Sequence, residues 1–208
     1  MTAFLTHPPR YKPAPKFAQG VTLIETLVAI VVLSIGLLGM AGLQAASTKY
    51  KINTWARSSA STLLSDLSER VRVNPDAAGG AAASNYVISD NWTTQQTAAL
   101  TVEKNCATQA CTASERATFD LLIWRERVRT SLPQGAALIE GDRSQGLTVT
   151  MMWFDKEQLG RTSPSDPLDL VAARTCSNTD KGMAQQTCCP AAAAAPAGVR
   201  CARFSFIP

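Results

Sequence analysis

The first long segment of the chain is almost entirely apolar. From Val21 to Ala46 the sequence carries a single charged residue, Glu25. As a helix this segment is about 39 Å long, which is enough to cross a bilayer with some tilt. A secretory signal peptide has a shorter apolar core, about 7 to 15 residues, and a small-x-small cleavage site that "GLQAAS" does not offer. The pattern therefore predicts a helix that anchors the chain in a membrane.

After this segment the apolar positions become periodic. Apolar side chains recur every three or four residues, with charged and polar residues between them. The recurring set is Ile52, Ala56, Ala60, Leu63, Leu67 and Val71. We expect Trp55 and Leu64 to widen this stripe. The sequence before Pro75 thus predicts one helix over residues 21–73, whose second half, 47–73, is amphipathic.

A second helical pattern lies in the remaining part of the chain. Thr112 and Glu115 have the spacing of a capping box, and Pro133 ends the pattern, so a helix is predicted over residues 112–132. Its apolar positions are Ala117, Leu121, Trp124, Val128 and Leu132. We expect Trp124 to lie in the core. We expect the charged positions to form a solvated face: Arg125, Glu126, Arg127 and Arg129.

Alternating and β-rich segments follow this helix. "AALIE" (136–140) and "LTVTMMWFD" (147–155) flank the glycine-bearing turn "GDRSQG", which predicts a β-hairpin. "GVRCARFSFI" (198–207) is expected to add a strand to the same sheet, whereas "NYVISDNW" is either a short strand or an irregular loop. The predicted fold class is α+β: a long N-terminal helix packed on a small domain with one helix and an antiparallel sheet.

The cysteines lie only in the part of the chain that follows the apolar segment. They are Cys106, Cys111, Cys176, Cys188, Cys189 and Cys201. Because no Cys-x-x-Cys pair and no nearby histidine is present, disulfides in an oxidising compartment are favoured over a zinc site. Proximity favours a bond between Cys106 and Cys111, and the pairing of the other four remains open. We expect them to staple the long Cys-rich loop, residues 156–200.

Charge and motifs argue against several classes of function. The formal charge is +4, but three cations precede Gly20 without any acid, so a chain that began after Gly20 would carry only +1. That is not the footprint of a nucleic-acid-binding protein. The single histidine, His7, lies in the same opening stretch, and neither a G-x-S-x-G motif nor a phosphate-binding loop occurs. We therefore expect no catalytic residue, no cofactor and no enzymatic activity.

Three acidic residues of the long loop raise the question of a metal. Asp166, Asp169 and Asp180 could in principle coordinate calcium, but they lack the D-x-D-x-D-G spacing of a calcium loop. We expect a solvated loop there and no metal site.

The lone carboxylate in the apolar segment calls for a partner, because an unpaired charge in lipid is costly. "G-VTLIETLVAIVVLSIGLLGMAGLQ" resembles the N-terminus of type IV pilins and pseudopilins. The resemblance implies that prepilin peptidase cuts between Gly20 and Val21, and that the new amino group of Val21 is N-methylated. It also implies that the Glu25 carboxylate pairs with this amine in its own or a neighbouring subunit. A terminal amine is mostly cationic at neutral pH, so the pair would fix the register of packed helices.

Within this superfamily, "IGLLGMAGLQ" most resembles the minor pilins of the PilV type. Gly36, Gly39 and Gly42 share roughly one side of the helix, and they either permit close helix packing or let the helix loosen in the filament. The resemblance implies four parts. They are a cleaved leader (1–20), a transmembrane and filament-core half-helix (21–46), the amphipathic half-helix (47–73) and a head domain outside the cytosol (74–208).

The same resemblance implies the function and the partners. The expected product is a minor pilin that joins other minor pilins in a priming complex at the pilus tip, initiates assembly of the major pilin and supports adhesion and twitching. Its expected partners are these pilins, prepilin peptidase, the inner-membrane assembly platform, a tip adhesin and, before assembly, the lipid bilayer. The expected location is the inner membrane, with the N-terminus cytoplasmic, and afterwards the pilus at the cell surface. Alternatives are a pseudopilin of the I type from a type II secretion system and, more distantly, a membrane-anchored periplasmic enzyme or sensor.

Overall fold

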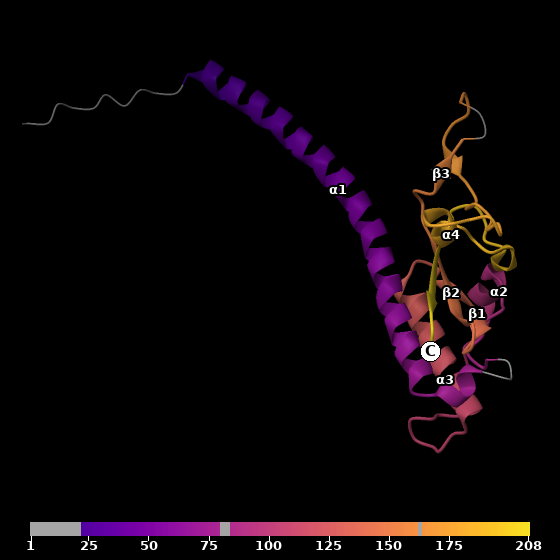
Figure 1. The fold of residues 1–208 in the computed structure, drawn as a ribbon. Helices are drawn as coiled ribbons and strands as arrows, with labels where there is room; N and C mark the ends of the chain where they lie inside the picture. The colour runs from indigo at the N-terminus through magenta and orange to yellow at the C-terminus, as the bar shows by residue number, and fades with distance from the viewer. Residues whose placement is uncertain (1–21, 80–83, 162–163) are drawn as a thin grey trace, which may run out of the picture. The chain divides into compact units, whose positions relative to one another are not determined.

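The computed structural model describes residues 22–79, 84–161 and 164–208 (Figure 1). Within α1, the side chains of residues 49, 50, 52 and 53 also lie outside the description. The chain divides into two units, Met1–Thr48 and Lys49–Pro208. Helix α1 (Leu23–Arg72) contributes its first half to the first unit and its second half to the second. The predicted helix is thus observed, although its expected first residue, Val21, lies outside the described residues.

The first unit consists, as far as it is described, of the apolar half of α1. Leu23–Thr48 has a mean hydropathy of 2.4, and none of its most apolar window is buried within the chain. By length and composition this segment could cross a membrane. The next charged residue after Glu25 is Lys49, so the whole described unit carries one formal charge.

The amphipathic half of α1 packs on the rest of the second unit through the predicted stripe. Its buried members are Ala56, Ala60, Leu63, Leu67 and Val71, while the side chain of Ile52 lies outside the description. Leu64 is partly buried against this core, as expected. Trp55 is 52% exposed, so the expectation that it widens the stripe is wrong. The physical reason is its place on the helix: Trp55 shares its side with Ser58, Ser59 and Thr62 instead.

The chain after α1 turns through a short 3-10 helix, η1 (Pro75–Ala78), with proline at its start. The break therefore falls where the sequence predicts it. The following segment, "NYVISDNW", is irregular and pairs with the sheet by a single bridge between Ile88 and Ile139. A short helix that the pattern did not predict, α2 (Trp92–Thr97), begins at the last residue of this segment. The side chain of Asn91 caps this helix by accepting a hydrogen bond from the Thr94 amide at 2.9 Å.

The second long helix, α3 (Ala113–Ser131), confirms the prediction. Thr112 and Glu115 form the capping box: the Thr112 hydroxyl accepts from the Glu115 amide, and the Glu115 carboxylate accepts from the Thr112 amide. All five predicted apolar positions are buried: Ala117, Leu121, Trp124, Val128 and Leu132. In Figure 1, α3 lies beside the second half of α1. A hydrogen bond from the Trp124 indole to the Leu63 carbonyl joins the two helices.

The predicted sheet is also present. Strands β1 (Ala136–Asp142) and β2 (Gly146–Phe154) form the hairpin, and β5 (Val199–Phe206) pairs antiparallel with β2, giving the order β1-β2-β5. Val149, Met151 and Trp153 face the core beneath α1 and α3, while Met152 faces a second, smaller core with Trp92 and Val199. Because both faces of β2 are covered, its apolar and polar residues alternate less strictly than in a half-exposed strand.

The long segment between β2 and β5 is more structured than the predicted loop. It contains a two-stranded ladder of β3 (Leu159–Gly160) and β4 (Asp169–Leu170), helix α4 (Met183–Thr187) and a 3-10 helix, η2 (Ala191–Ala193). Each of these elements is two to five residues long, too short to show a period in the sequence.

Candidate assembly site

Glu25 lies in the first turn of α1, where a carboxylate interacts favourably with the partial positive charge of the helix start. Its backbone amide donates a 3.4 Å hydrogen bond to the Thr22 hydroxyl. Among the described residues its carboxylate has no ion pair or hydrogen bond. The predicted cleavage site, Gly20 and Val21, and hence the expected amine partner, lie outside the described residues.

The apolar half of α1 exposes thirteen large apolar side chains. They are Leu23, Ile24, Leu27, Val28, Ile30, Val31, Val32, Leu33, Ile35, Leu37, Leu38, Met40 and Leu43, each at least half exposed. Burial of one such side chain contributes about 1.5 to 3 kcal/mol, so leaving all of them in water would cost tens of kcal/mol. This surface therefore needs an apolar environment, which lipid or the helices of other subunits can provide.

Three hydroxyl groups of this segment find their acceptors within the helix. Thr26 donates to the Leu23 carbonyl at 2.8 Å, Ser34 to the Ile30 carbonyl at 2.7 Å and Thr48 to the Gln44 carbonyl at 2.9 Å. Side-chain donors that are satisfied within the helix remove an obstacle to burial in lipid or in a helix bundle. Glu25 is thus the one described group of this segment whose charge needs an external partner.

The three glycines of the segment have open surroundings. A methyl group added at Gly36, Gly39 or Gly42 would meet no atom within 4 Å beyond the helix itself. No contact within the described residues requires glycine at these positions. The glycines are therefore compatible with close approach of another helix and equally with loosening of α1. Their role remains a prediction.

A buried polar network ties the end of α1 to α3 in the second unit. Asp120 is central: its carboxylate accepts from the Arg70 guanidinium at 3.0 Å and from the Tyr86 hydroxyl at 2.9 Å. Asn74 donates to the Tyr86 oxygen at 3.1 Å and to the Ala113 carbonyl at 2.8 Å. Burial, and next the neighbouring Asp120, raise the pKa of Tyr86 well above its usual range. The sequence analysis did not identify this network, because its members are 12 to 50 residues apart.

The expectation of a solvated face on α3 is confirmed for two of its four charged residues and wrong for the other two, Arg125 and Arg129, which are partly buried. Arg125 pairs with Asp90 at 3.3 Å and Arg127 with Asp66 at 3.0 Å. Arg129 donates to the Gln95 carbonyl, and burial lowers its pKa. The reason is that α1 and the segment around α2 flank α3, so long arginine side chains reach acceptors on both. Glu126 and Arg127 are exposed as predicted, although Arg127 also forms its ion pair with Asp66.

The buried amide of Gln95 connects α2 to the edge of the sheet. Its nitrogen donates to the carbonyls of Asp90 and Ala137, at 2.6 and 2.9 Å, and its oxygen accepts from the Ala137 amide at 3.2 Å. The Gln95 amide thus satisfies backbone donor and acceptor groups at the edge of β1 that a neighbouring strand would otherwise bind. A glutamine in an unpredicted helix gives no such signal in the sequence.

All six cysteines form disulfides, which confirms that expectation. The pairs are Cys106–Cys111, Cys176–Cys188 and Cys189–Cys201. The first is the pair favoured by proximity, and the structure supplies the other two. The adjacent Cys188 and Cys189 have different partners. Cys188 therefore closes a bond within the long loop, while Cys189 links the loop to Cys201 of β5.

The acidic residues of this loop have ordinary roles where they are described. Asp180 accepts from Arg174 at 2.7 Å and from the Ser177 amide at 2.7 Å, and these bonds lower its pKa. Among the described residues no group of three or more His, Cys, Asp or Glu side chains could hold a metal ion.

Two family comparisons match consecutive parts of the chain. Residues 15–41 match the prokaryotic N-terminal methylation motif, and residues 42–122 match a Tt1218-like family described as type IV pilin Tt1218. No curated protein and no solved structure matches the chain significantly. The matches support a place in the type IV pilin superfamily. The long N-terminal helix, the C-terminal domain with helices and the antiparallel sheet are consistent with a type IV pilin fold.

Proposed function

We propose that this chain, a member of the type IV pilin superfamily by both matches, is a minor pilin of the PilV type. It joins other minor pilins in a priming complex at the pilus tip, on which the major pilin polymerises. The observation that carries the proposal is the described first unit: a helix with every apolar side chain exposed and one carboxylate without a described partner. Residues 15–41, which include this carboxylate, match the methylation motif. A folded head held by three disulfides follows it.

Maturation begins at the start of the apolar segment. Prepilin peptidase cuts after Gly20, and the amino group of Val21 becomes N-methylated while remaining cationic. One turn of helix separates it in sequence from Glu25. The methylation-motif match spans all three residues and supports this step.

Assembly exchanges one apolar environment for another. In the inner membrane the exposed side chains of Leu23–Thr48 contact lipid, and in the filament they contact the equivalent helices of other subunits. Because van der Waals contacts are similar in both environments, apolar burial alone would not fix how the helices are staggered. Pairing of Glu25 with a terminal amine supplies that register, since every stagger without the pair leaves a charge buried alone.

The head works outside the cytosol and contributes surfaces, not catalysis. The pilin matches support a structural role. Disulfides suit an oxidising compartment. The chain has no nucleotide-binding loop, so the inner-membrane assembly platform and its motor supply the work of extrusion. Adhesion and twitching follow from the polymer that the complex initiates, in company with a tip adhesin.

A pseudopilin of the I type from a type II secretion system is the alternative. It shares the cleavage motif, the exposed helix and the fold class, and it differs in the fibre that it primes. A membrane-anchored periplasmic enzyme or sensor is a more distant alternative, and it gives no reason for a cleaved leader or for Glu25.

The test replaces the lone acid and follows the fibre. We expect Glu25→Gln to leave membrane insertion and leader cleavage intact while incorporation into sheared pili falls by at least about tenfold, because a filament register then lacks its ion pair. Gln44→Ala, a polar change in the same helix, is the matched control and should assemble normally. Normal incorporation of the Glu25→Gln protein would contradict the proposal. Loss of protein secretion without loss of pili would favour the pseudopilin.

A further inference from the structure

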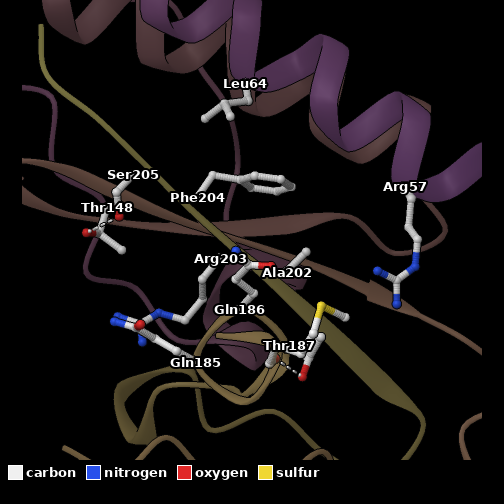
Figure 2. Close-up of a pocket in the computed structure, with 11 residues that line it drawn as sticks. Arg57, Leu64, Thr148, Gln185, Gln186, Thr187, Ala202, Arg203, Phe204 and Ser205 are labelled. Carbon is white, nitrogen blue, oxygen red and sulfur yellow. Dashed lines mark hydrogen bonds between the residues drawn. The ribbon is translucent and has the colours of Figure 1, made fainter. Parts of the chain in front are cut away.

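A groove of about 530 Å³ lies along strand β5 in the second unit (Figure 2). Four consecutive residues of β5, Ala202 to Ser205, line it together with Thr148 of β2 and side chains from α1 and α4. Among the described strands, β5 pairs only with β2. The groove therefore lies where an edge strand has backbone groups that no further strand satisfies.

The groove reaches both faces of the sheet. Successive side chains of a strand point to opposite faces, so Ala202 and Phe204 face the core beneath α1, whereas Arg203 and Ser205 point to the other side. Leu64 and Phe204, both partly buried, supply apolar surface on the α1 side. Access from both faces suits an extended chain along the edge better than a compact ligand.

The charge of the groove has one sign. Arg57 from α1 and Arg203 from β5 both line it, and no aspartate or glutamate does. In Figure 2 Arg57 enters from one side and Arg203 extends on the other, with Ala202 and Phe204 between them. A site with two cations, no acid and an apolar floor is complementary to an acidic segment that also carries apolar side chains.

Neither cation forms an ion pair or a hydrogen bond with a carboxylate of the described residues. Arg57 is exposed and forms no hydrogen bond or ion pair with a described residue. The Arg203 Nη1 atom contacts only the Sγ atoms of Cys176 and Cys188, at 3.6 and 3.9 Å, and its Nε is buried without a partner. Asp180 is already hydrogen-bonded to Arg174 and to the Ser177 amide, and the charge of Arg203 only adds to the lowering of its pKa without a direct contact. A partly buried guanidinium group without a hydrogen-bonded carboxylate points to an acceptor from outside the chain.

We propose that this groove binds an extended acidic segment of a neighbouring pilin subunit, whose carboxylates pair with Arg57 and Arg203 while its backbone lies along β5. The proposal rests on the proposed function for the identity of the neighbour. Extended segments that add to a sheet edge gain main-chain hydrogen bonds, and their side chains gain specificity from flanking pockets. Here the flanking groups are the two guanidinium groups and the apolar surface of Leu64 and Phe204.

The test places a photo-crosslinker in the groove of the full chain in its native cells. Gln186 of α4 lines the groove, is exposed and has no side-chain partner among the described residues, so Gln186→p-benzoylphenylalanine should be tolerated. Irradiation of piliated cells should give an adduct that peptide mass spectrometry assigns to an Asp- or Glu-containing segment of another pilin. Adding Arg57→Glu should reduce this adduct by roughly fivefold or more, because it replaces attraction by repulsion.

The controls separate the groove from folding and from assembly. Arg143→Glu reverses an exposed charge in the β1-β2 turn and should leave the adduct unchanged. Thiol alkylation should show three intact disulfides in every variant, and Arg57→Gln should give an intermediate adduct level. An adduct to a segment without acids, one that Arg57→Glu does not change, or none at all in pili that contain the protein would overturn the groove proposal. Absence of the protein from pili would instead count against the proposed function.

Discussion

The indole nitrogen of Trp124 donates a 2.7 Å hydrogen bond to the backbone carbonyl of Leu63. Both residues are buried, one on α3 and the other on α1, and they join the amphipathic half of the long helix to the head. The contact bridges 61 positions of sequence and lies within the core that the buried stripe of α1 enters from Ala56 onwards.

Truncation at this junction should weaken the head. Trp124→Ala is expected to reduce the free energy of unfolding by about 3 to 5 kcal/mol, because it leaves a large cavity. Trp124→Phe keeps most of the apolar volume but loses the hydrogen bond, and should cost clearly less. Urea denaturation of the detergent-solubilised protein, followed by fluorescence, measures both. Equal costs for the two variants would show that the hydrogen bond, not the packing, dominates.

The two borderline positions of α1 should behave differently. Trp55→Ala should change the free energy of unfolding by no more than about 0.5 kcal/mol, because half of the side chain is exposed. Leu64→Ala removes a partly buried contact with the core and should cost more. The comparison uses the same urea titration. A large loss for Trp55→Ala would mean that this side chain is covered in the folded protein.

The sequence predicted the elements whose signal is local and repeated. The stripe from Ala56 to Val71, the capping box at Thr112 and the β1-β2 hairpin were all readable because periodicity, cap chemistry and turn residues are short-range features. Trp55 was misplaced because one position on a helix turns a side chain by about 100°, and size alone does not reveal the direction.

The site was predictable only in part. Glu25 stands out because it is a charged residue in an otherwise apolar segment, where burial of a charge in lipid is costly. The roles of Arg125, Arg127 and Arg129 were missed, since their acceptors come from α1 and from the segment around α2, which are distant in the chain. The Cys176–Cys188 and Cys189–Cys201 pairs could not be predicted either, because four unassigned cysteines allow three pairings.

The buried Tyr86 should make the stability of the head depend on pH in the alkaline range. Its pKa is raised in the folded protein, so the unfolded chain loses the phenol proton first, near its usual pKa of about 10. The stabilising contribution of the Tyr86 phenol is fully present below that pH. It declines as the pH rises towards the pKa of Tyr86 in the folded protein. The fall approaches about 1.4 kcal/mol per pH unit for one proton.

Comparison with Tyr86→Phe isolates this contribution from the titration of lysines. Between about pH 9.5 and 11 the free energy of unfolding of the wild-type protein should fall more steeply with pH than that of the variant. The difference in slope should correspond to roughly one proton, and urea midpoints measured across that range would show it. Parallel pH profiles would mean that the Tyr86 phenol does not keep its proton in the fold.

The three disulfides should contribute unequally. A chain-entropy estimate gives about 3 kcal/mol for a loop of the size closed by Cys189–Cys201 and about 2 kcal/mol for the shorter Cys106–Cys111 loop. The first also fixes the buried Cys201 on β5. Replacing each pair by serines should therefore lower the urea midpoint most for Cys189–Cys201. A larger effect at Cys106–Cys111 would contradict this ranking.

The measurement closest to the central claim is the N-terminal residue of the mature protein, purified from its native host and analysed by intact and peptide mass spectrometry. Cleavage by prepilin peptidase predicts a chain that begins at Val21 with a methylated amino group, four residues before Glu25. A mature protein that still begins upstream of Gly20, or that has an unmodified start elsewhere, would contradict the account.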